Sequence, residues 1–282
     1  MNAKMGIHLS TWQESWDDPL LPLIARADRA GFDVAEFPLL FPEQLPYQAL
    51  RRELDRRGMS ASCGTGLSPE TDITHPDPEV RRLGLEHLKA CLRGAAQLGS
   101  PVLGGLTYAP WGVFPEDDRD KRRERCADSL QEAARFAGEQ GVTLCLEVVN
   151  RFEGYLVNTV EQGLDLIERV NSPYVSLHLD TFHLNIESDH IAAAIRKAGD
   201  HLGHFHCVAN NRKRPGAGHI PWGDVRSALE SIPYGGYLVA ETFIRPEGEV
   251  GAGLFIWRSL AEDRDENARL TAEFLRRTFD DL

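Results

Sequence analysis

The chain has 282 residues, of which 42% are apolar and 26% are charged, and these proportions are typical of a folded globular protein. Its formal net charge of −12 opposes binding to nucleic acid or to an anionic membrane, because such binding depends on Lys and Arg. No apolar segment approaches the ~20 residues that span a bilayer, and the first residues lack the apolar core of a signal peptide, so we expect a cytoplasmic protein whose partner is a small molecule.

Short β-rich segments alternate with longer amphipathic segments along the chain. Strands are predicted over residues 5–10, 32–37, 59–64, 101–106, 142–147, 175–180, 202–207 and 237–242. Helices are predicted over residues 21–31, 48–58, 79–99, 128–141 and 160–170. Several of these helical segments end on glycine, which commonly terminates a helix: Gly31, Gly58, Gly99 and Gly141.

Eight strand–helix units in a chain of this length predict a (β/α)8 TIM barrel, an α/β fold, as one domain over residues 1–282. The alternative is a doubly wound open sheet. Such a sheet normally carries a glycine-rich phosphate loop after its first strand, and the segment HLSTWQESW contains no glycine.

Four of the predicted strands end on residues that bind metals, namely Glu147, Asp180, His206 and Glu241. A charged group is costly to bury unless it is paired or bound to a metal. In a TIM barrel the carboxyl ends of the strands meet at one mouth, so we expect these four side chains to lie together. The alternative for each acid taken singly is a solvated residue at a strand end.

Three carboxylates and one imidazole form an oxygen-rich ligand set that suits Mn²⁺, Mg²⁺ or Co²⁺ better than zinc in a thiolate site. Glu153, His183 and Arg212 follow the candidate ligands closely and are predicted to contact a substrate. A metal bound to two neighbouring oxygens of a ketose would acidify the carbon between them, and two carboxylates could then exchange its proton. This chemistry is epimerisation of a sugar.

Five segments match the sequence pattern of a known family: EVVNRFEGYLVNT (147–159), LDTFHLNIE (179–187), GHFH (203–206), NRKRPGAGHIPW (211–222) and EVGAGLFIWRSL (249–260). The chain resembles the ketose 3-epimerases, which act on D-tagatose, D-allulose (D-psicose) or L-ribulose and belong to the superfamily of xylose-isomerase-like barrels. The resemblance extends over nearly the whole chain and is densest from residue 142 onward. It implies a TIM barrel fold and a homodimer or homotetramer.

The resemblance also implies roles for individual residues. Glu147, Asp180, His206 and Glu241 would hold one divalent ion, most often Mn²⁺, with Co²⁺ or Mg²⁺ as alternatives. Glu147 and Glu241 would also be the acid–base pair, one removing the C3 proton of a ketose to give a cis-enediolate and the other protonating the opposite face. The expected substrate contacts are Glu153, His183 and Arg212 around O1 to O3, with Trp111 at the far end of the sugar.

Three positions depart from the family pattern. The family reads H-x-G-E-[AS]-N-R after the seventh strand, whereas this chain reads HCVANNR, so Ala209 replaces a glutamate. Thr242 follows Glu241 where the family commonly has proline. His8 replaces an aromatic residue, often tyrosine, on the first strand. His8 is therefore a candidate substrate contact, with a packed, hydrogen-bonded histidine as the alternative.

Other residues carry weaker signals. Glu36, at the end of the second strand, is expected either to contact substrate or to support a metal ligand. His204 lies two positions before His206 and is expected to point away from the site into the barrel wall.

The positions of the five tryptophans and the five cysteines in the sequence indicate their expected roles. Trp12, Trp16 and Trp111 are candidates for stacking on a sugar ring, and Trp222 and Trp257 are expected to be packing residues. The five cysteines include no C-x-x-C pair, so we interpret them as small buried apolar residues rather than as a disulfide framework or a zinc cluster.

Three further functions remain open from sequence. The first is a lyase that follows the same enolisation with loss of a leaving group from a 3-keto-glycoside. The second is a noncatalytic sugar-binding subunit. The third, by fold analogy alone, is an abasic-site endonuclease, which would require additional histidine ligands and a basic surface.

Overall fold

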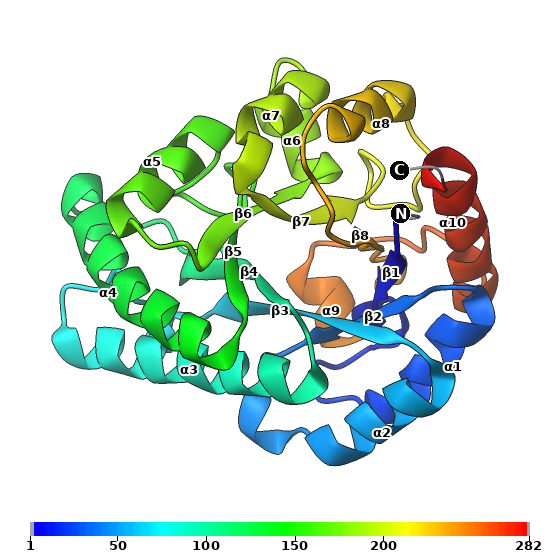
Figure 1. Ribbon diagram of the computed structural model, residues 1–282, viewed down its shortest axis with the longest axis horizontal. Coiled ribbons are helices and arrows are strands. Elements are labelled where there is room, and N and C mark those ends of the chain that lie inside the picture. The colour runs from blue at the N-terminus through cyan, green and yellow to red at the C-terminus, as the bar shows by residue number, and fades with distance from the viewer. Residues whose placement is uncertain (1–2, 281–282) are drawn as a thin grey trace.

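The computed structural model describes residues 3–280. Eight parallel strands form a closed barrel in the order β1 to β8, with helices around its outside (Figure 1). The predicted TIM barrel is therefore confirmed. The strands are β1 (Met5–His8), β2 (Val34–Pro38), β3 (Ser60–Leu67), β4 (Val102–Pro110), β5 (Thr143–Glu147), β6 (Val175–Asp180), β7 (Leu202–Cys207) and β8 (Leu238–Ala240).

All eight predicted strands are present. β6 and β7 have the predicted bounds, and the other six strands differ from the prediction at one or both ends. β4 extends to Pro110, well beyond residue 106. β8 ends at Ala240, so Glu241 occupies the first position after the strand rather than a position within it. This shift keeps Glu241 at the carboxyl end of the barrel, where side chains from different strands converge.

The helices mostly connect the strands and lie around the outside of the barrel (Figure 1). They are α1 (Leu21–Ala30), α2 (Tyr47–Arg57), α3 (Pro78–Leu98), α4 (Arg119–Gln140), α5 (Val160–Val170), α6 (Thr181–Glu187), α7 (Ile191–Ala198), α8 (Trp222–Glu230), α9 (Gly248–Gly253) and α10 (Arg264–Phe279). The predicted α5 is correct at both ends. The prediction for α4 began at residue 128, whereas the helix starts at Arg119, because the Asp118 side chain accepts hydrogen bonds from the N–H groups of Asp120 and Lys121 and so caps a highly charged first turn.

Glycine ends four of these helices in the left-handed region. Gly31, Gly58, Gly99 and Gly141 have φ values of 95°, 67°, 72° and 68°. A side chain at such a φ would be strained, which explains why glycine ends these helices and why the predicted ends are correct.

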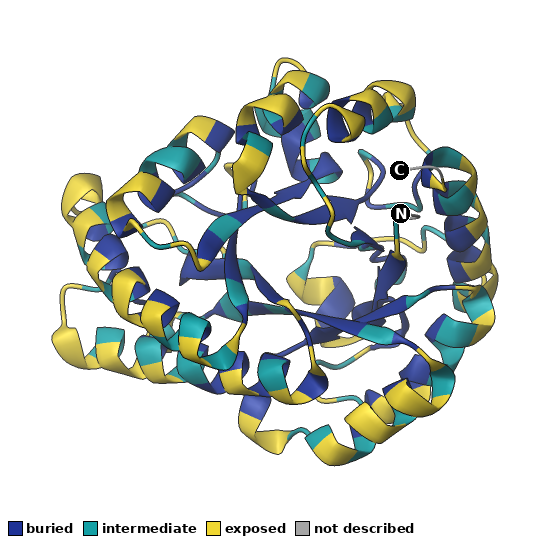
Figure 2. Cartoon of the chain, viewed as in Figure 1, coloured by how far each residue is buried: buried dark blue, intermediate teal, exposed yellow. Residues whose placement is uncertain are grey.

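The core lies inside the barrel and between the barrel and its helices. The strands are buried on both faces, while each outer helix presents its exposed side to solvent (Figure 2). Burial on both faces is typical of parallel sheets and explains why the strand segments read as nearly continuous apolar runs. None of the helices within residues 3–280 is both long and apolar enough to cross a membrane.

Candidate functional site

A cavity of about 570 Å³ opens at the carboxyl ends of the strands. Of the residues proposed from sequence, ten line it: His8, Trp16, Glu36, Trp111, Glu147, Glu153, His183, His206, Arg212 and Glu241. Asp180 is completely buried at the end of β6, beside His206 and Arg212. Residues from β1, β5, β6, β7 and the segment after β8 therefore converge on one place, as expected for a TIM barrel.

Three of the four predicted metal ligands form a tight cluster. Glu147, Asp180 and His206 each offer an atom within 4.8 Å of the other two, and all three are buried. Glu241 lies beside this cluster, with its Oε1 atom 3.8 Å from Nδ1 of His206. The Oδ2 atom of Asp180 is 3.9 Å from the same nitrogen. The four side chains thus surround one small volume.

The ring of His206 is oriented by Glu36. Nε2 of His206 lies 2.6 Å from Oε1 of Glu36, which is fully buried. Since a carboxylate accepts hydrogen bonds, Nε2 is the donor to Glu36, and Nδ1 faces Asp180 and Glu241. Hydrogen bonding of the second ring nitrogen to a carboxylate is a common arrangement for a histidine that binds a metal.

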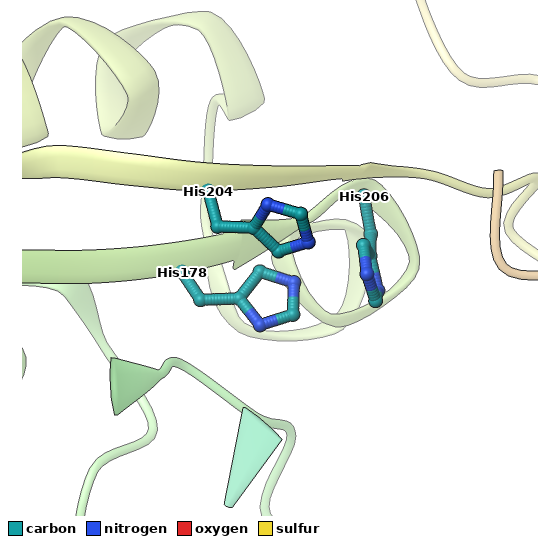
Figure 3. Close-up of side chains that lie close together, drawn as sticks. All are labelled: His178, His204 and His206. Carbon is teal, nitrogen blue, oxygen red and sulfur yellow. The ribbon is translucent and has the colours of Figure 1, made fainter. Parts of the chain in front are cut away.

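Two further histidines line the floor of the cavity beside His206 (Figure 3). The prediction that His204 points away from the site is wrong: its Nε2 atom lies 2.7 Å from Oε2 of Glu36. Residues two apart on a strand point to the same face, so His204 and His206 had to share one side of β7. His178, on the neighbouring strand β6, was missed, although it stands two positions before Asp180 and the same rule could have found it.

Glu147 is held by His183. Nδ1 of His183 accepts hydrogen bonds from the backbone N–H and the side-chain amide of Asn150, at 3.2 and 2.8 Å. The proton of the neutral ring therefore lies on Nε2, which is 3.5 Å from Oε1 of Glu147. This arrangement points a donor at the carboxylate.

Arg212 contacts three carboxylates of the site. Its Nη1 atom is 2.9 Å from Oε2 of Glu241 and 3.5 Å from Oδ2 of Asp180, and its Nη2 atom is 3.3 Å from Oε2 of Glu153. The guanidinium also stacks over Phe182, at 4.0 Å from the ring centre. Arg212 has a φ of 61°, an uncommon value for a residue other than glycine, and such strain is typical of functional positions.

Trp111 forms a wall of the cavity above Glu153. Its Nε1 atom donates to Oε2 of Glu153 at 3.2 Å, and its ring stacks on Phe255 at 5.7 Å between ring centres. Phe255 is 73% exposed and covers the side of Trp111 on which it stacks.

The predictions for the other four tryptophans agree with the structure in part. Trp16 lines the cavity, as proposed. Trp12 does not line it, because its Nε1 atom donates to Asp265 on α10. Trp222 packs against aromatic residues of α10, as predicted. The prediction that Trp257 is a packing residue is wrong, since its side chain is 81% exposed.

The positions that depart from the family pattern are accommodated locally. Ala209 is fully buried, and its N–H donates to the carbonyl of Lys213, which closes the loop after β7. Thr242 is buried and exchanges a hydrogen bond with Thr11 at 3.0 Å between hydroxyl oxygens. The Nδ1 atom of His8 is hydrogen-bonded to Ser10, and its ring lines the cavity. Of these three, only His8 faces the cavity.

Charges at the site shift one another's pKa. Burial raises the pKa of Asp180 to about 6. Burial also opposes ionisation of Glu241, but His206 and Arg212 outweigh it and hold the pKa of Glu241 below its usual range. Five carboxylates lie at the site: Glu36, Glu147, Glu153, Asp180 and Glu241. Arg212 is the one guanidinium that contacts them, so the negative charge exceeds the positive charge and the site is suited to a cation.

The five cysteines are buried and unpaired, as predicted. Cys207 ends β7 next to His206, and burial raises the pKa of its thiol well above the usual value. A thiol that stays protonated is a poor nucleophile and a poor metal ligand.

Comparison with known proteins assigns the family. The model of the xylose isomerase-like TIM barrel family matches residues 24–278. The chain is 37% identical to a D-psicose 3-epimerase of Ruminiclostridium cellulolyticum, over 93% of this chain and 92% of that protein. It is 32% identical to an L-ribulose 3-epimerase of Methylomonas sp., over 97% of both. A crystal structure of a D-psicose 3-epimerase in the presence of D-fructose superimposes with a TM-score of 0.94, at 32% identity over 98% of this chain and 99% of that one. The chain therefore belongs to the xylose isomerase-like TIM barrel family and groups there with the ketose 3-epimerases, which are isomerases that act on sugars.

Proposed function

We propose that this protein is a metal-dependent epimerase that inverts C3 of a free ketose of the D-tagatose, D-fructose, D-allulose or L-ribulose type. The observation that carries the proposal is the convergence of Glu147, Asp180 and His206 within 4.8 Å of one another, with Glu241 beside them. The relatives named as D-psicose and L-ribulose 3-epimerases support this choice of reaction.

The donor set fits a divalent ion. Asp180 Oδ2 and His206 Nδ1 are buried, lie 3.9 Å apart and form no hydrogen bond within residues 3–280, and the one cation near Oδ2 is the Arg212 guanidinium at 3.5 Å. Unpartnered buried polar atoms are costly, and a cation held by these atoms together with Glu147 and Glu241 would remove that cost. Carboxylate-rich sets with one imidazole suit Mn²⁺, Co²⁺ or Mg²⁺, and we propose Mn²⁺. When bound, the ion would act as a Lewis acid toward the ketose and so make its C3 proton easier to remove.

Glu147 and Glu241 are the proposed acid–base pair. β5 and β8 are separated around the barrel by β6 and β7, so the two carboxylates approach a bound sugar from different sides. One carboxylate takes the C3 proton and the other, protonated, delivers a proton to the opposite face, which inverts C3 and leaves the atom count unchanged. His183 holds Glu147 and Arg212 holds Glu241 in place for these transfers.

The remaining polar residues are proposed to orient the sugar. Glu153, His183 and Arg212 lie together on the β5 to β7 side of the cavity, where they can bind the hydroxyl groups around O1 to O3. Trp111, whose Nε1 atom donates to Glu153, and His8 also line the cavity and would contact the rest of the sugar.

The proposed function is tested by hydrogen exchange at C3. The protein is stripped of metal, supplied with Mn²⁺ or left without it, and incubated in deuterated water with a panel of free ketoses. We expect loss of the C3 proton signal in the NMR spectrum and appearance of the C3 epimer only with metal. Exchange without metal would contradict the metal dependence, and absence of exchange with every ketose would contradict the reaction.

Self-association into a homodimer or homotetramer is also proposed. Phe152, Phe255 and Trp257 are 70%, 73% and 81% exposed, and exposed aromatic side chains of this kind favour a protein interface. Sedimentation of the purified protein tests this proposal, and a monomer at all concentrations would contradict it.

A further inference from the structure

The cavity is larger than a free ketose requires. A water molecule occupies ~30 Å³ of liquid, and bonded atoms pack more closely than separate waters, so a hexulose of six carbons and six oxygens fills less than about 360 Å³. The cavity measures about 570 Å³. A substantial part of it therefore remains beyond a bound hexulose.

The additional space lies beside two glycines of β3, Gly64 and Gly66. On the neighbouring strand β4, a Cβ atom at Gly104, the register partner of Gly64, would lie 3.0 Å from Nδ1 of His178, so the space does not extend there. A Cβ atom at Gly64 would meet nothing closer than Nε2 of His8 at 3.9 Å, and one at Gly66 would meet nothing within 4 Å. Side chains normally fill the interior of a TIM barrel, so these bare positions leave the wall open.

This part of the cavity lies across the barrel from the proposed sugar contacts. Its walls follow β2 and β3, whereas Glu153, His183 and Arg212 belong to the side formed by β5, β6 and β7. We call it the β2–β3 arm, and the residues that define it are Pro38, Leu40, Phe41, Gly64, Thr65, Gly66, Leu67, Ser68, Thr71 and His87.

The β2–β3 arm has no Arg, Lys, Asp or Glu among its residues, and it combines the apolar side chains of Pro38, Leu40, Phe41 and Leu67 with a few hydroxyl groups and one imidazole. Arg212 is the one Arg or Lys among the residues that line the whole cavity, and its guanidinium already contacts Glu153, Glu241 and Asp180. The recognition of a phosphate commonly depends on Arg or Lys. The residues that line the cavity therefore offer no further Arg or Lys that could bind one. Phe41 is 46% exposed at the rim of the arm and offers an apolar face.

We propose that the β2–β3 arm binds an uncharged, partly apolar substituent carried by the ketose at the end remote from C1, so that substituted ketoses are substrates and phosphorylated ketoses are not. This inference rests on the proposed function, because it places C1 to C3 at Glu153, His183 and Arg212. The end of the sugar near C6 then faces β2 and β3, and a group on O6 enters the arm.

The experiment compares D-fructose, 6-O-benzyl-D-fructose and D-fructose 6-phosphate with the wild-type protein loaded with Mn²⁺. Deuterium exchange at C3 gives kcat/KM, and the fluorescence of the cavity tryptophans gives binding without turnover. We expect the benzyl ether to have the lower KM and the tighter binding, by at least about tenfold, as expected for a buried apolar group. The phosphate ester should bind more weakly than D-fructose. A benzyl ether that binds no more tightly than D-fructose, or a phosphate ester that binds best, would overturn the inference.

Gly66→Leu fills the arm without touching the acid–base residues. It should lower kcat/KM for the benzyl ether at least about tenfold and change the value for D-fructose by less than about threefold. Gly223→Leu is the matched control, because Gly223 is exposed on α8 and a Cβ there meets nothing within 4 Å. If Gly66→Leu does not fold, Phe41→Ala at the half-exposed rim replaces it. This variant should likewise lower kcat/KM for the benzyl ether more than for D-fructose. Equal losses for both ketoses would overturn the inference.

The two proposals fail in different ways. Absence of C3 exchange with every ketose would overturn the proposed function, whereas fluorescence would still report whether the benzyl ether enters the arm. Exchange on D-fructose with no preference for the benzyl ether would overturn only the inference about the arm.

Discussion

Oε1 of Glu36 lies 2.6 Å from Nε2 of His206, and both side chains are buried. Burial alone would raise the pKa of Glu36, but the neighbouring imidazoles of His206 and His204 hold it well below the usual range. The carboxylate therefore stays charged and fixes the ring of His206 with Nδ1 toward the proposed metal ligands.

Glu36→Gln should weaken metal binding. A glutamine side chain is nearly the same size but has no charge, and it can donate as well as accept, so it no longer fixes the proton on Nε2 of His206. We expect the affinity for Mn²⁺, measured by titration calorimetry on the stripped protein, to fall about 10- to 100-fold. Glu168→Gln, at an exposed position on α5, should leave the affinity unchanged. An unaltered affinity in Glu36→Gln would show that Glu36 does not position His206.

Glu147→Gln and Glu241→Gln should each abolish epimerisation. Amides cannot exchange the C3 proton, and loss of a general acid or base costs ~10²- to 10⁴-fold in rate. The loss is measured as C3 exchange in deuterated water, with circular dichroism to confirm that each variant is folded. If Glu241→Gln retained wild-type activity, the two-carboxylate mechanism would be wrong.

Arg212→Ala should chiefly weaken substrate binding. The guanidinium is buried among Glu153, Glu241 and Asp180, so its loss removes both a donor to the sugar and the cation that holds Glu241. We expect KM for the ketose to rise at least about tenfold, with a smaller fall in kcat. Arg212→Lys keeps the charge but not the forked donors and should recover only part of the loss. Arg196→Ala, exposed on α7, is the control, and an unchanged KM in Arg212→Ala would contradict the assigned contact.

Asp180→Asn should stabilise the metal-free protein at neutral pH. Burial raises the pKa of Asp180 from 3.8 to about 6, so the folded state binds this proton more tightly than the unfolded state. The free energy of unfolding therefore falls as pH rises from about 4 to 6, and Asn, which has no proton to lose, avoids that fall. It can still accept the N–H of Phe182, as Asp180 does at the start of α6.

At pH 7 the free energy of unfolding of Asp180→Asn should exceed that of the wild type by on the order of 1–2 kcal/mol, measured by urea unfolding with chelator present. This difference should disappear below about pH 3, where Asp180 is protonated in both states. Asp128→Asn, exposed on α4, should show no such pH dependence. A variant that is less stable than wild type at pH 7 would contradict the assignment.

The cysteines should resist labelling in the folded protein. All five are buried, and burial raises the pKa of each thiol, to about 12 for Cys91. Since the thiolate is the reactive form, a disulfide reagent added at pH 8 should release almost no chromophore until denaturant is added, and then five equivalents. Rapid labelling of one thiol in the native protein would show that this site opens to solvent.

Sequence determined much of the fold and part of the site. The alternation of apolar strands and amphipathic helices predicted the barrel and all eight strands, because each pattern follows from the side on which a local element must be buried. The candidate ligands were identified for the same reason: Glu147, Asp180 and His206 interrupt or end buried strands, where an unpaired charge is costly. Helix ends at glycine were predictable because a left-handed φ is a local property.

Only the tertiary structure decided how these residues meet. The contact of Glu36 with His206 joins residues 170 positions apart, and no local pattern reports such a distance. The burial of Trp12 against α10, the exposure of Trp257 and the opening beside Gly64 and Gly66 likewise depend on what packs against each element. Local sequence sets which face of a strand or helix is apolar, but the closure of the barrel sets which of those faces share a cavity.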